Sequence, residues 1–157
     1  MSAGLVPDKL DHLSAVRSLA KLMDTAFTIP GTNVRFGLDA LLGLLPGIGD
    51  AISSAVGGYI VMIAAQLGVS RAVLWRMTLN LGIDMLVGAI PLVGDLFDIG
   101  WKANVMNANL LERALADPEG TRRRSAGVLA GLVLVLLLLT AGTVALTWWV
   151  LQMLVKS

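Results

Sequence analysis

The C-terminal part of the chain is a long stretch without charge. No Asp, Glu, Lys or Arg occurs in the 30 positions from Ala126 to Val155. The hydrocarbon core of a bilayer is about 30 Å thick, and a helix of about 20 apolar residues crosses it. The stretch therefore predicts a transmembrane helix over residues 126–155, and a chain that carries such a helix is not expected to be a soluble monomer.

Basic residues around this stretch predict its orientation. Three arginines at positions 122–124 stand directly before it, whereas Lys156 alone follows it. Because Lys and Arg are enriched on the cytoplasmic side of transmembrane helices, the N-terminal side of this helix is expected in the cytoplasm. The expected location is therefore the cytoplasmic (inner) membrane.

Composition narrows the class of protein further. Hydrophobic residues make up 56% of the chain and charged residues 15%, against roughly 45–50% and about 25% in soluble domains. A net charge of +1 argues against a strongly basic nucleic-acid-binding protein. Cysteine is absent and His12 is the single histidine, so thiolate chemistry and histidine clusters are excluded. We expect no catalytic, cofactor-binding or metal-binding residues, and no cofactor.

The first 30 residues predict an amphipathic helix. Over residues 8–27 apolar side chains recur at spacings of three and four, and polar side chains, Asp24 among them, take the opposite side. Pro7 suits the first turn, and Pro30 with Gly31 is expected to end the helix. The apolar stripe indicates packing on the rest of the protein, or alternatively contact with the cytoplasmic membrane surface; packing is favoured.

The middle of the chain contains an internal repeat. The sequence GLDALLGLLPGIGD begins at Gly37 and returns as GIDMLVGAIPLVGD at Gly82, an offset of 45 residues. Both fit GxDxLxGxxPxxGD, with seven identities in fourteen positions. Such a repeat indicates one supersecondary unit used twice. Each unit is expected to be a helix, a PxxGD break and a second helix, over about residues 36–69 and 81–114.

The repeats supply two sets of candidate residues. The candidate ion-path or structural polar residues are Asp39, Asp84, Asp50, Asp95 and Asp98, and the packing residues are Gly43, Gly88, Pro46 and Pro91. In each first helix Asp, Gly and Pro share one stripe, where glycine lets two backbones approach closely. The aspartate that ends each GD pair is expected to cap the helix after the break.

Asp39 and Asp84 lie inside apolar helical segments, where an ionised carboxylate is costly. Arg35 and Asn80 stand four residues before them, which predicts a salt bridge in one repeat and a hydrogen bond in the other. Structural pairing is the favoured interpretation. The alternative is that both carboxylates line a path for a cation or proton, as interrupted helices do in transporters.

Asp95 and Asp98 form a DxxD pair, which is a weak signal for a hard cation bound through oxygen ligands. The favoured interpretation is a capping aspartate followed by an intrahelical pair between Asp98 and Lys102. Several asparagines in and after the second repeat, namely Asn80, Asn104, Asn107 and Asn109, are candidates to satisfy buried polar groups.

The number of membrane crossings within the repeats is constrained by charge. Both flanks of the repeats are basic, and Lys and Arg are enriched on the cytoplasmic side of a membrane. Both flanks are therefore expected in the cytoplasm, which leaves zero or two crossings between them. Two crossings would use the uncharged run 51–69 and would export Arg71 and Arg76. Zero crossings are therefore favoured, with the repeats as re-entrant or shallow hairpins from the cytoplasmic side.

The stretches IPGTNVRFGLDALLGLLPGIGD and PLVGDLFDIGWKANVMNANLLE, with the 45-residue spacing of their PxxGD elements, resemble the family called domain of unknown function 4112. The resemblance covers roughly residues 17–117, and the C-terminal hydrophobic helix lies outside it. It implies a recurring domain of a bacterial and fungal group with no established activity, and it supplies no catalytic residues.

These features together predict an all-α integral membrane protein with a duplicated helix-PxxGD-helix unit and a C-terminal transmembrane helix. The expected segments are an amphipathic N-terminal helix (1–30), a helical-hairpin module (31–117), a basic linker (118–125) and the transmembrane helix (126–155).

The favoured function is non-enzymatic. It is a helical packing module that associates with the lipid bilayer, with a second copy of the chain or with a membrane protein partner, and not with nucleic acid. One alternative is a small ion or proton channel or transporter that uses Asp39 and Asp84. The least favoured is a metal-dependent enzyme acting on lipid headgroups, with Asp95 and Asp98 holding the metal.

Overall fold

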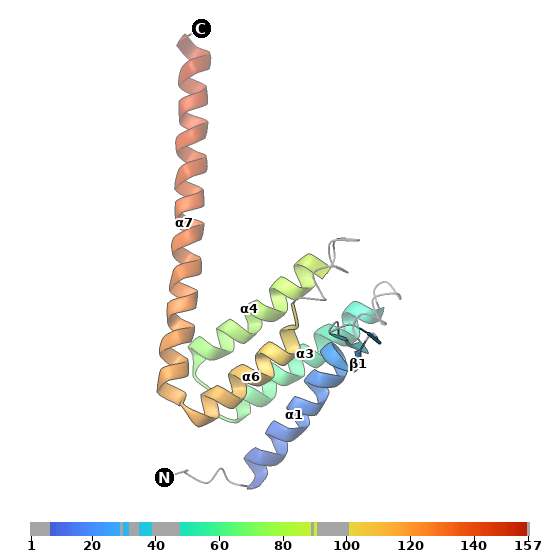
Figure 1. Ribbon diagram of the computed structural model, residues 1–157. Helices are drawn as coiled ribbons and strands as arrows, with labels where there is room; N and C mark the ends of the chain where they lie inside the picture. Colours follow the sequence, from blue (N-terminus) through green and yellow to red (C-terminus); the bar gives the residue numbers. More distant parts are fainter. Residues whose placement is uncertain are drawn as a thin grey trace.

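The computed structural model describes residues 7–28, 30–31, 35–38, 48–88, 90 and 101–156 of the chain. Its helices are α1 (Pro7–Thr25), α3 (Ile48–Gln66), α4 (Arg71–Gly88), α6 (Ala103–Ala116) and α7 (Pro118–Lys156). The first four pack side by side into a helical module, and α7 rises from one end of that module (Figure 1). The predicted all-α class is confirmed.

The N-terminal helix α1 packs on the module along its apolar stripe. Val16, Ala20 and Met23 follow one another at spacings of four and three, and each is at most 2% exposed. Their side of the helix lies mainly against α6 and also contacts α3. The stripe therefore packs on the rest of the protein, which is the favoured of the two interpretations.

A short β-pair follows α1. Strand β1 (Phe27–Thr28) runs antiparallel to β2 (Arg35–Phe36), with Phe27 opposite Phe36. Pro30 and Gly31 lie in a turn after β1, where Gly31 has a φ of +81° that suits glycine. These two residues were expected to end the helix, and this prediction is wrong. Helix α1 already stops at Thr25, and the chain then enters the β-pair.

The helices α3 and α4 form an antiparallel hairpin with a tight connection. Gly68 has a φ of +79°, and its N–H donates to the carbonyl of Ala65 while the N–H of Val69 donates to that of Ala64. This is the hydrogen-bond pattern of a Schellman motif, in which a left-handed glycine ends a helix. The short connection makes α3 and α4 neighbours in the module.

The hairpin is closely packed at Gly57 of α3. A Cβ added there would lie 2.5 Å from Cδ1 of Leu81 and 3.3 Å from Oδ1 of Asn104, whereas one added at Gly58 would meet nothing within 4 Å. We expect Gly57→Ala to lower the free energy of unfolding by about 1 kcal/mol, because the contact must open. Gly58→Ala should raise it by about 0.5–1 kcal/mol, because alanine is the better helix former.

Thermal unfolding of the two purified variants, followed by circular dichroism, measures this difference. The neighbouring glycine is the matched control, since both substitutions add one methyl group to the same helix. Equal shifts in Tm for Gly57→Ala and Gly58→Ala would contradict a close α3–α4 contact at Gly57.

Helix α6 lies at the centre of the module. It packs on α1, α3, α4 and α7, and half of its length is buried, namely Ala103, Asn104, Asn107, Ala108, Leu110, Leu111 and Ala114. Ile60 of α3 and Met77 of α4 meet it in the apolar core, where both are fully buried. Burial of such side chains is the main source of stability for the module.

Helix α7 begins directly after α6. Pro118 takes its first position, which suits a proline, and the side chain of Asp117 accepts a hydrogen bond from the N–H of Gly120 at 3.0 Å. Residues 118–125, which the sequence analysis assigned to a basic linker, are thus the first turns of α7. The hydrogen bond from Gly120 to Asp117 and the proline at the first position account for the helical structure of residues 118–125.

The described chain has one helix that is long and apolar enough to cross a membrane, and it is α7 over Pro118–Leu154. Near its start Thr121 and Ser125 are buried where α7 packs on α4 and α6. From residue 130 to residue 154 every side chain is exposed. At about 1.5 Å per residue, this free part is roughly 38 Å long, which is enough to span a hydrocarbon core.

Candidate functional site

A buried carboxylate of α1 holds the beginning of α6. Asp24 is 7% exposed, and its two oxygens accept hydrogen bonds of 2.8 Å from the backbone N–H of Val105 and from Nδ2 of Asn104. The N–H of Val105 is in the first turn of α6, where no intrahelical acceptor exists. The helix dipole also favours a negative charge there. Asp24 therefore caps α6 from another helix.

Lys102 strengthens the same junction. It stands at the N-cap position of α6 and gives that helix no side-chain cap, while its Nζ donates to the backbone carbonyl of Asp24 at 3.0 Å. The pairing of Lys102 with Asp98 stays a prediction, because Asp98 lies outside the described residues. The observed contact ties Lys102 to the C-terminal turn of α1.

The assignment of Asp24 to the polar side of α1 is wrong. Asp24 lies one helical turn after Ala20, so it continues the buried side of the helix, and α6 covers it. A carboxylate is tolerated there because the start of α6 supplies hydrogen-bond donors.

A second group of hydrogen bonds joins α4 to α6. Nδ2 of Asn80 donates to Oδ1 of Asn107 at 2.8 Å, and Nδ2 of Asn107 donates to the backbone carbonyl of Met77 at 3.0 Å. Asn80 is 6% exposed and Asn107 is fully buried, and Nε1 of Trp101 donates to the carbonyl of Asn80 at 3.3 Å. Buried amides need such partners, so this group fixes how α4 lies on α6.

The asparagines thus behave as the sequence indicated in three of four cases. Asn80, Asn104 and Asn107 are buried and hydrogen-bonded, whereas Asn109 is exposed. The amide of Asn80, expected to serve Asp84, donates to Asn107 across the helix interface.

Only part of the candidate set can be placed. Asp84 is half-buried on α4, Gly88 is the last residue of that helix, and Asp50 is the third residue of α3, its side chain not being described. The other candidates, namely Asp39, Asp95, Asp98, Gly43, Pro46 and Pro91, lie outside the residues that the structure describes. The ion path and the DxxD pair therefore remain predictions.

The helical spacing on which the predicted salt bridge between Arg35 and Asp39 rests is absent at Arg35, while Asp39 lies outside the residues that the structure describes. Arg35 belongs to strand β2, where it is paired with Thr28. The i,i+4 spacing brings side chains together only on a helix. The spacing from Arg35 to Asp39 therefore gives no reason to expect that ion pair.

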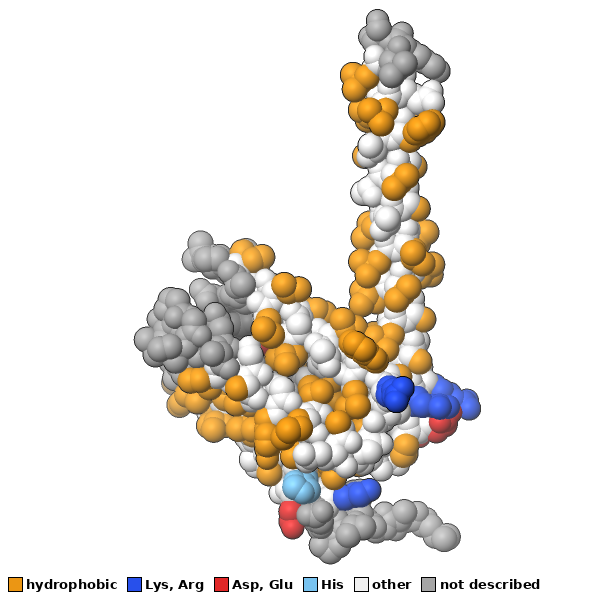
Figure 2. Space-filling model, turned by 180° about the vertical axis from the view of Figure 1, so that it is seen from behind, with side chains coloured by type: hydrophobic (Ala, Val, Ile, Leu, Met, Phe, Trp, Pro, Cys, Tyr) orange, Lys and Arg blue, Asp and Glu red, His pale blue; other side chains and the backbone are white. Residues whose placement is uncertain are grey.

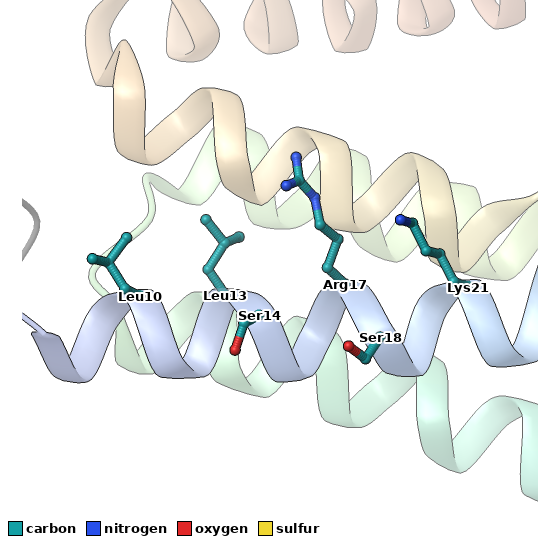
Figure 3. A pocket seen from close by; sticks show the side chains of 6 residues that line it. All are labelled: Leu10, Leu13, Ser14, Arg17, Ser18 and Lys21. Carbon is teal, nitrogen blue, oxygen red and sulfur yellow. The ribbon is translucent and has the colours of Figure 1, made fainter.

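A shallow groove runs along the side of α1 that borders α6. It is lined by Leu10, Leu13, Ser14, Arg17, Ser18 and Lys21. Figure 3 shows Leu13, Arg17 and Lys21 directed towards α6, and Arg17 forms an ion pair with Glu112 of that helix. The two partners are 47% and 40% exposed, so the pair adds little to stability. The groove joins an apolar end to a basic end, and its arginine is already paired.

Metal-ligating groups do not gather in the part of the chain that the structure covers. Within it, no group of three or more His, Asp or Glu side chains is placed to hold a metal ion. The polar groups that meet there, around Asp24 and around Asn107, are bonded to α6 and α4. These hydrogen bonds can fix the positions of α1 and α4 relative to α6.

Comparison with known proteins assigns the module. Residues 12–115 match a family described as domain of unknown function (DUF4112). No curated protein and no solved structure gives a match. The matched residues include α1 from His12 onward and the whole of α3 and α4, and they extend into the last turn of α6, whereas α7 lies outside them. Because the match covers more than half of the chain, the protein belongs to the family of the domain of unknown function (DUF4112).

Proposed function

We propose that the protein is a non-enzymatic membrane protein whose helical module is held at the cytoplasmic surface of the inner membrane by α7. The observation that carries the proposal is the free part of α7, where apolar side chains are exposed on all sides over residues 130–154. Burial of apolar surface is worth about 25 cal/mol per Å². A helix that is apolar all round requires lipid or other helices around it.

Charges at the base of α7 support the orientation. The three arginines at positions 122–124 are exposed, and Glu119 pairs with Arg122 at 2.8 Å and with Arg123 at 2.9 Å. Figure 2 shows Lys and Arg side chains gathered where α7 leaves the module. Basic residues at this end favour the cytoplasmic side of a membrane.

The interior of the module supports a packing role. Asp24 and Asn107 are buried and are bonded to other helices of the fold. Such groups hold helices in one arrangement. The partners that fit this role are the bilayer itself, a second copy of the chain or another membrane protein.

Charged substitutions in the free part of α7 test the anchor. Leu134→Arg combined with Leu138→Arg places two charges on one face of the span, and each is costly by about 2.5–3.5 kcal/mol near the bilayer centre. We expect the wild-type protein to stay with membranes after alkaline carbonate extraction and flotation. The double variant should leave the membrane fraction.

The matched control is Ser14→Arg combined with Ser18→Arg, because these exposed residues have the same spacing on α1. That variant should float with the membranes like the wild type. Flotation separates membrane-bound protein from aggregates, which remain at the bottom of the gradient. Release of the wild-type protein by carbonate, or continued flotation of the α7 double variant, would refute the anchor.

A further inference from the structure

We propose that the α3–α4 hairpin is itself immersed in the lipid leaflet beside α7. The surface concerned, called here the hairpin face, consists of Ile52, Tyr59 and Met62 of α3 with Trp75, Met85 and Leu86 of α4. The proposal rests on the proposed function, because α7 must first bring the module to a bilayer. It adds a second lipid-binding surface, made by the matched domain rather than by the span.

The exposed side of α4 carries large apolar side chains, together with the polar residues Arg71 and Thr78. Trp75, Met85 and Leu86 are 64%, 53% and 75% exposed. The side turned towards the module carries buried Asn80 and half-buried Asp84. A helix at an aqueous surface places its polar residues outward, whereas helices in lipid turn ionisable groups towards the protein. The exposed side of α4 therefore fits hydrocarbon.

Helix α3 continues this surface. Ile52, Tyr59 and Met62 are 40%, 46% and 46% exposed, and the segment Ile52–Gln66 is an apolar helix without a charged residue. Tyr59 and Trp75 supply the amphipathic aromatic side chains that are enriched where hydrocarbon meets the headgroups.

The other helices in the described part of the chain leave the hairpin face exposed. Helix α1 packs on α6 and α3, and the base of α7 packs on α4 and α6. Among the helices that the structure describes, α1 and α7 thus lie at the two flanks of α6, while the large apolar side chains of the hairpin face stay exposed. Contiguous exposed apolar surface of this kind marks an interaction site.

The position of α7 identifies lipid as the occupant. Helix α4 is the edge of the module nearest to the direction in which α7 rises, and α1 is the edge farthest from it (Figure 1). Helix α4 also contacts α7 directly. A bilayer that surrounds the free part of α7 therefore lies next to α4, so the hairpin face continues a surface that already requires lipid.

The exposed charged residues of α4 and α1 lie where the proposed lipid contact requires headgroups or water. Arg71 is exposed at the start of α4, one turn before Trp75, and the partly exposed Arg76 follows Trp75 directly. Both charges lie in the first two turns of α4, which suits the headgroup level. On α1, at the opposite edge, Asp11, Arg17 and Lys21 are exposed and suit water. The hairpin thus enters the leaflet without crossing it, with its connection near the base of α7 (Figure 1).

Lipid contact can be measured with single cysteines, because the chain has none of its own. The environment-sensitive fluorophore NBD is attached at Met62→Cys and Leu86→Cys, and at Ser18→Cys and Arg113→Cys as exposed controls on α1 and α6. Leu138→Cys marks the span. Each labelled full-length protein is placed in vesicles of phosphatidylcholine and phosphatidylglycerol, with and without nitroxide-labelled acyl chains.

We expect several-fold stronger nitroxide quenching at positions 62 and 86 than at positions 18 and 113, and quenching at 138 comparable to that at 86. All five side chains lie at exposed positions, and thermal unfolding checks that each labelled protein keeps the wild-type fold. Iodide, an aqueous quencher, should give the reverse order.

The outcomes separate this inference from the proposed function. Strong quenching at 138 with weak quenching at 62 and 86 would overturn the inference and leave the anchor in place. Weak quenching at 138 as well would refute the anchor. Protection of position 86 from both iodide and nitroxide lipid would show that a protein surface covers the hairpin face, which also overturns the inference.

Discussion

Gly37→Ala is expected to lower the free energy of unfolding by about 3 kcal/mol, at the upper end of the cost of overpacking. Gly37 is buried directly after β2, and a Cβ added there would overlap the backbone carbonyl of Met23. A flexible side-chain end can turn away from a new methyl group, but this neighbour is backbone near the end of α1. Thermal unfolding of the purified protein should show a loss in Tm of about 6–12 °C, given about 2–4 °C per kcal/mol for a chain of this size.

The repeat provides the control for this substitution. Gly82 has the same position in the second copy of the motif, yet it lies within α4 and a Cβ there would meet nothing within 4 Å. Gly82→Ala should therefore stabilise the protein by about 0.5–1 kcal/mol, because alanine is the better helix former. Similar melting of the two variants would show that Gly37 does not lie against Met23 as described.

Asp24→Ala is the second substitution with a large expected effect, a loss of about 2–3 kcal/mol. The change removes the acceptor for the N–H of Val105 and for Nδ2 of Asn104, both at the start of α6. Leaving a buried donor without a partner costs about 1–3 kcal/mol. Thermal unfolding gives the size of the effect, and hydrogen exchange of the Val105 amide should become faster because its acceptor is gone.

Two further substitutions make this test specific. Asp11→Ala removes an exposed carboxylate from the same helix, and it should change stability by no more than about 0.5 kcal/mol. Asp24→Asn keeps one oxygen acceptor and removes the charge, so its effect should lie between the other two. An Asp24→Ala variant that unfolds like Asp11→Ala, with unchanged exchange at Val105, would rule out the capping role.

Features that depend on local patterns were predictable from the sequence. The spacing of Val16, Ala20 and Met23 indicated α1 and the side that it buries, and the uncharged stretch after Ser125 indicated the apolar part of α7. The repeated PxxGD elements indicated the family, which the match over residues 12–115 confirms. Each of these signals is contained in a short window of residues.

Features that depend on distant contacts were not predictable in this way. The partners of Asp24 lie about 80 residues further along the chain, so no pattern within α1 distinguishes its carboxylate from a solvated one. The β-pair has strands of two residues, too short to show an alternation. Pro30 and Gly31 lie in a turn, but α1 ends before them, and the pairing of Phe27 with Phe36 decides what the turn connects.

The residues of the candidate site also combine locally predictable features with features that depend on distant contacts. Asn80 and Asn107 could be named as buried polar residues from their apolar surroundings, yet their mutual bond follows from how α4 lies on α6. Gly37 was visible as a repeat position, but its close contact arises only when the chain after β2 returns to Met23. Identical residues in the two copies of the motif therefore carry different constraints.

The short junction between the module and α7, at Asp117, has a mechanical consequence. The hydroxyl of Thr121 donates to the carbonyl of Arg113 at 3.0 Å, and Ser125, one turn later, is fully buried. These contacts fix the base of α7 to the module. Transmembrane helices adjust their tilt to the thickness of the bilayer. In a membrane-anchored protein of this shape, a thinner bilayer that tilts α7 would turn the whole module by the same angle relative to the membrane surface.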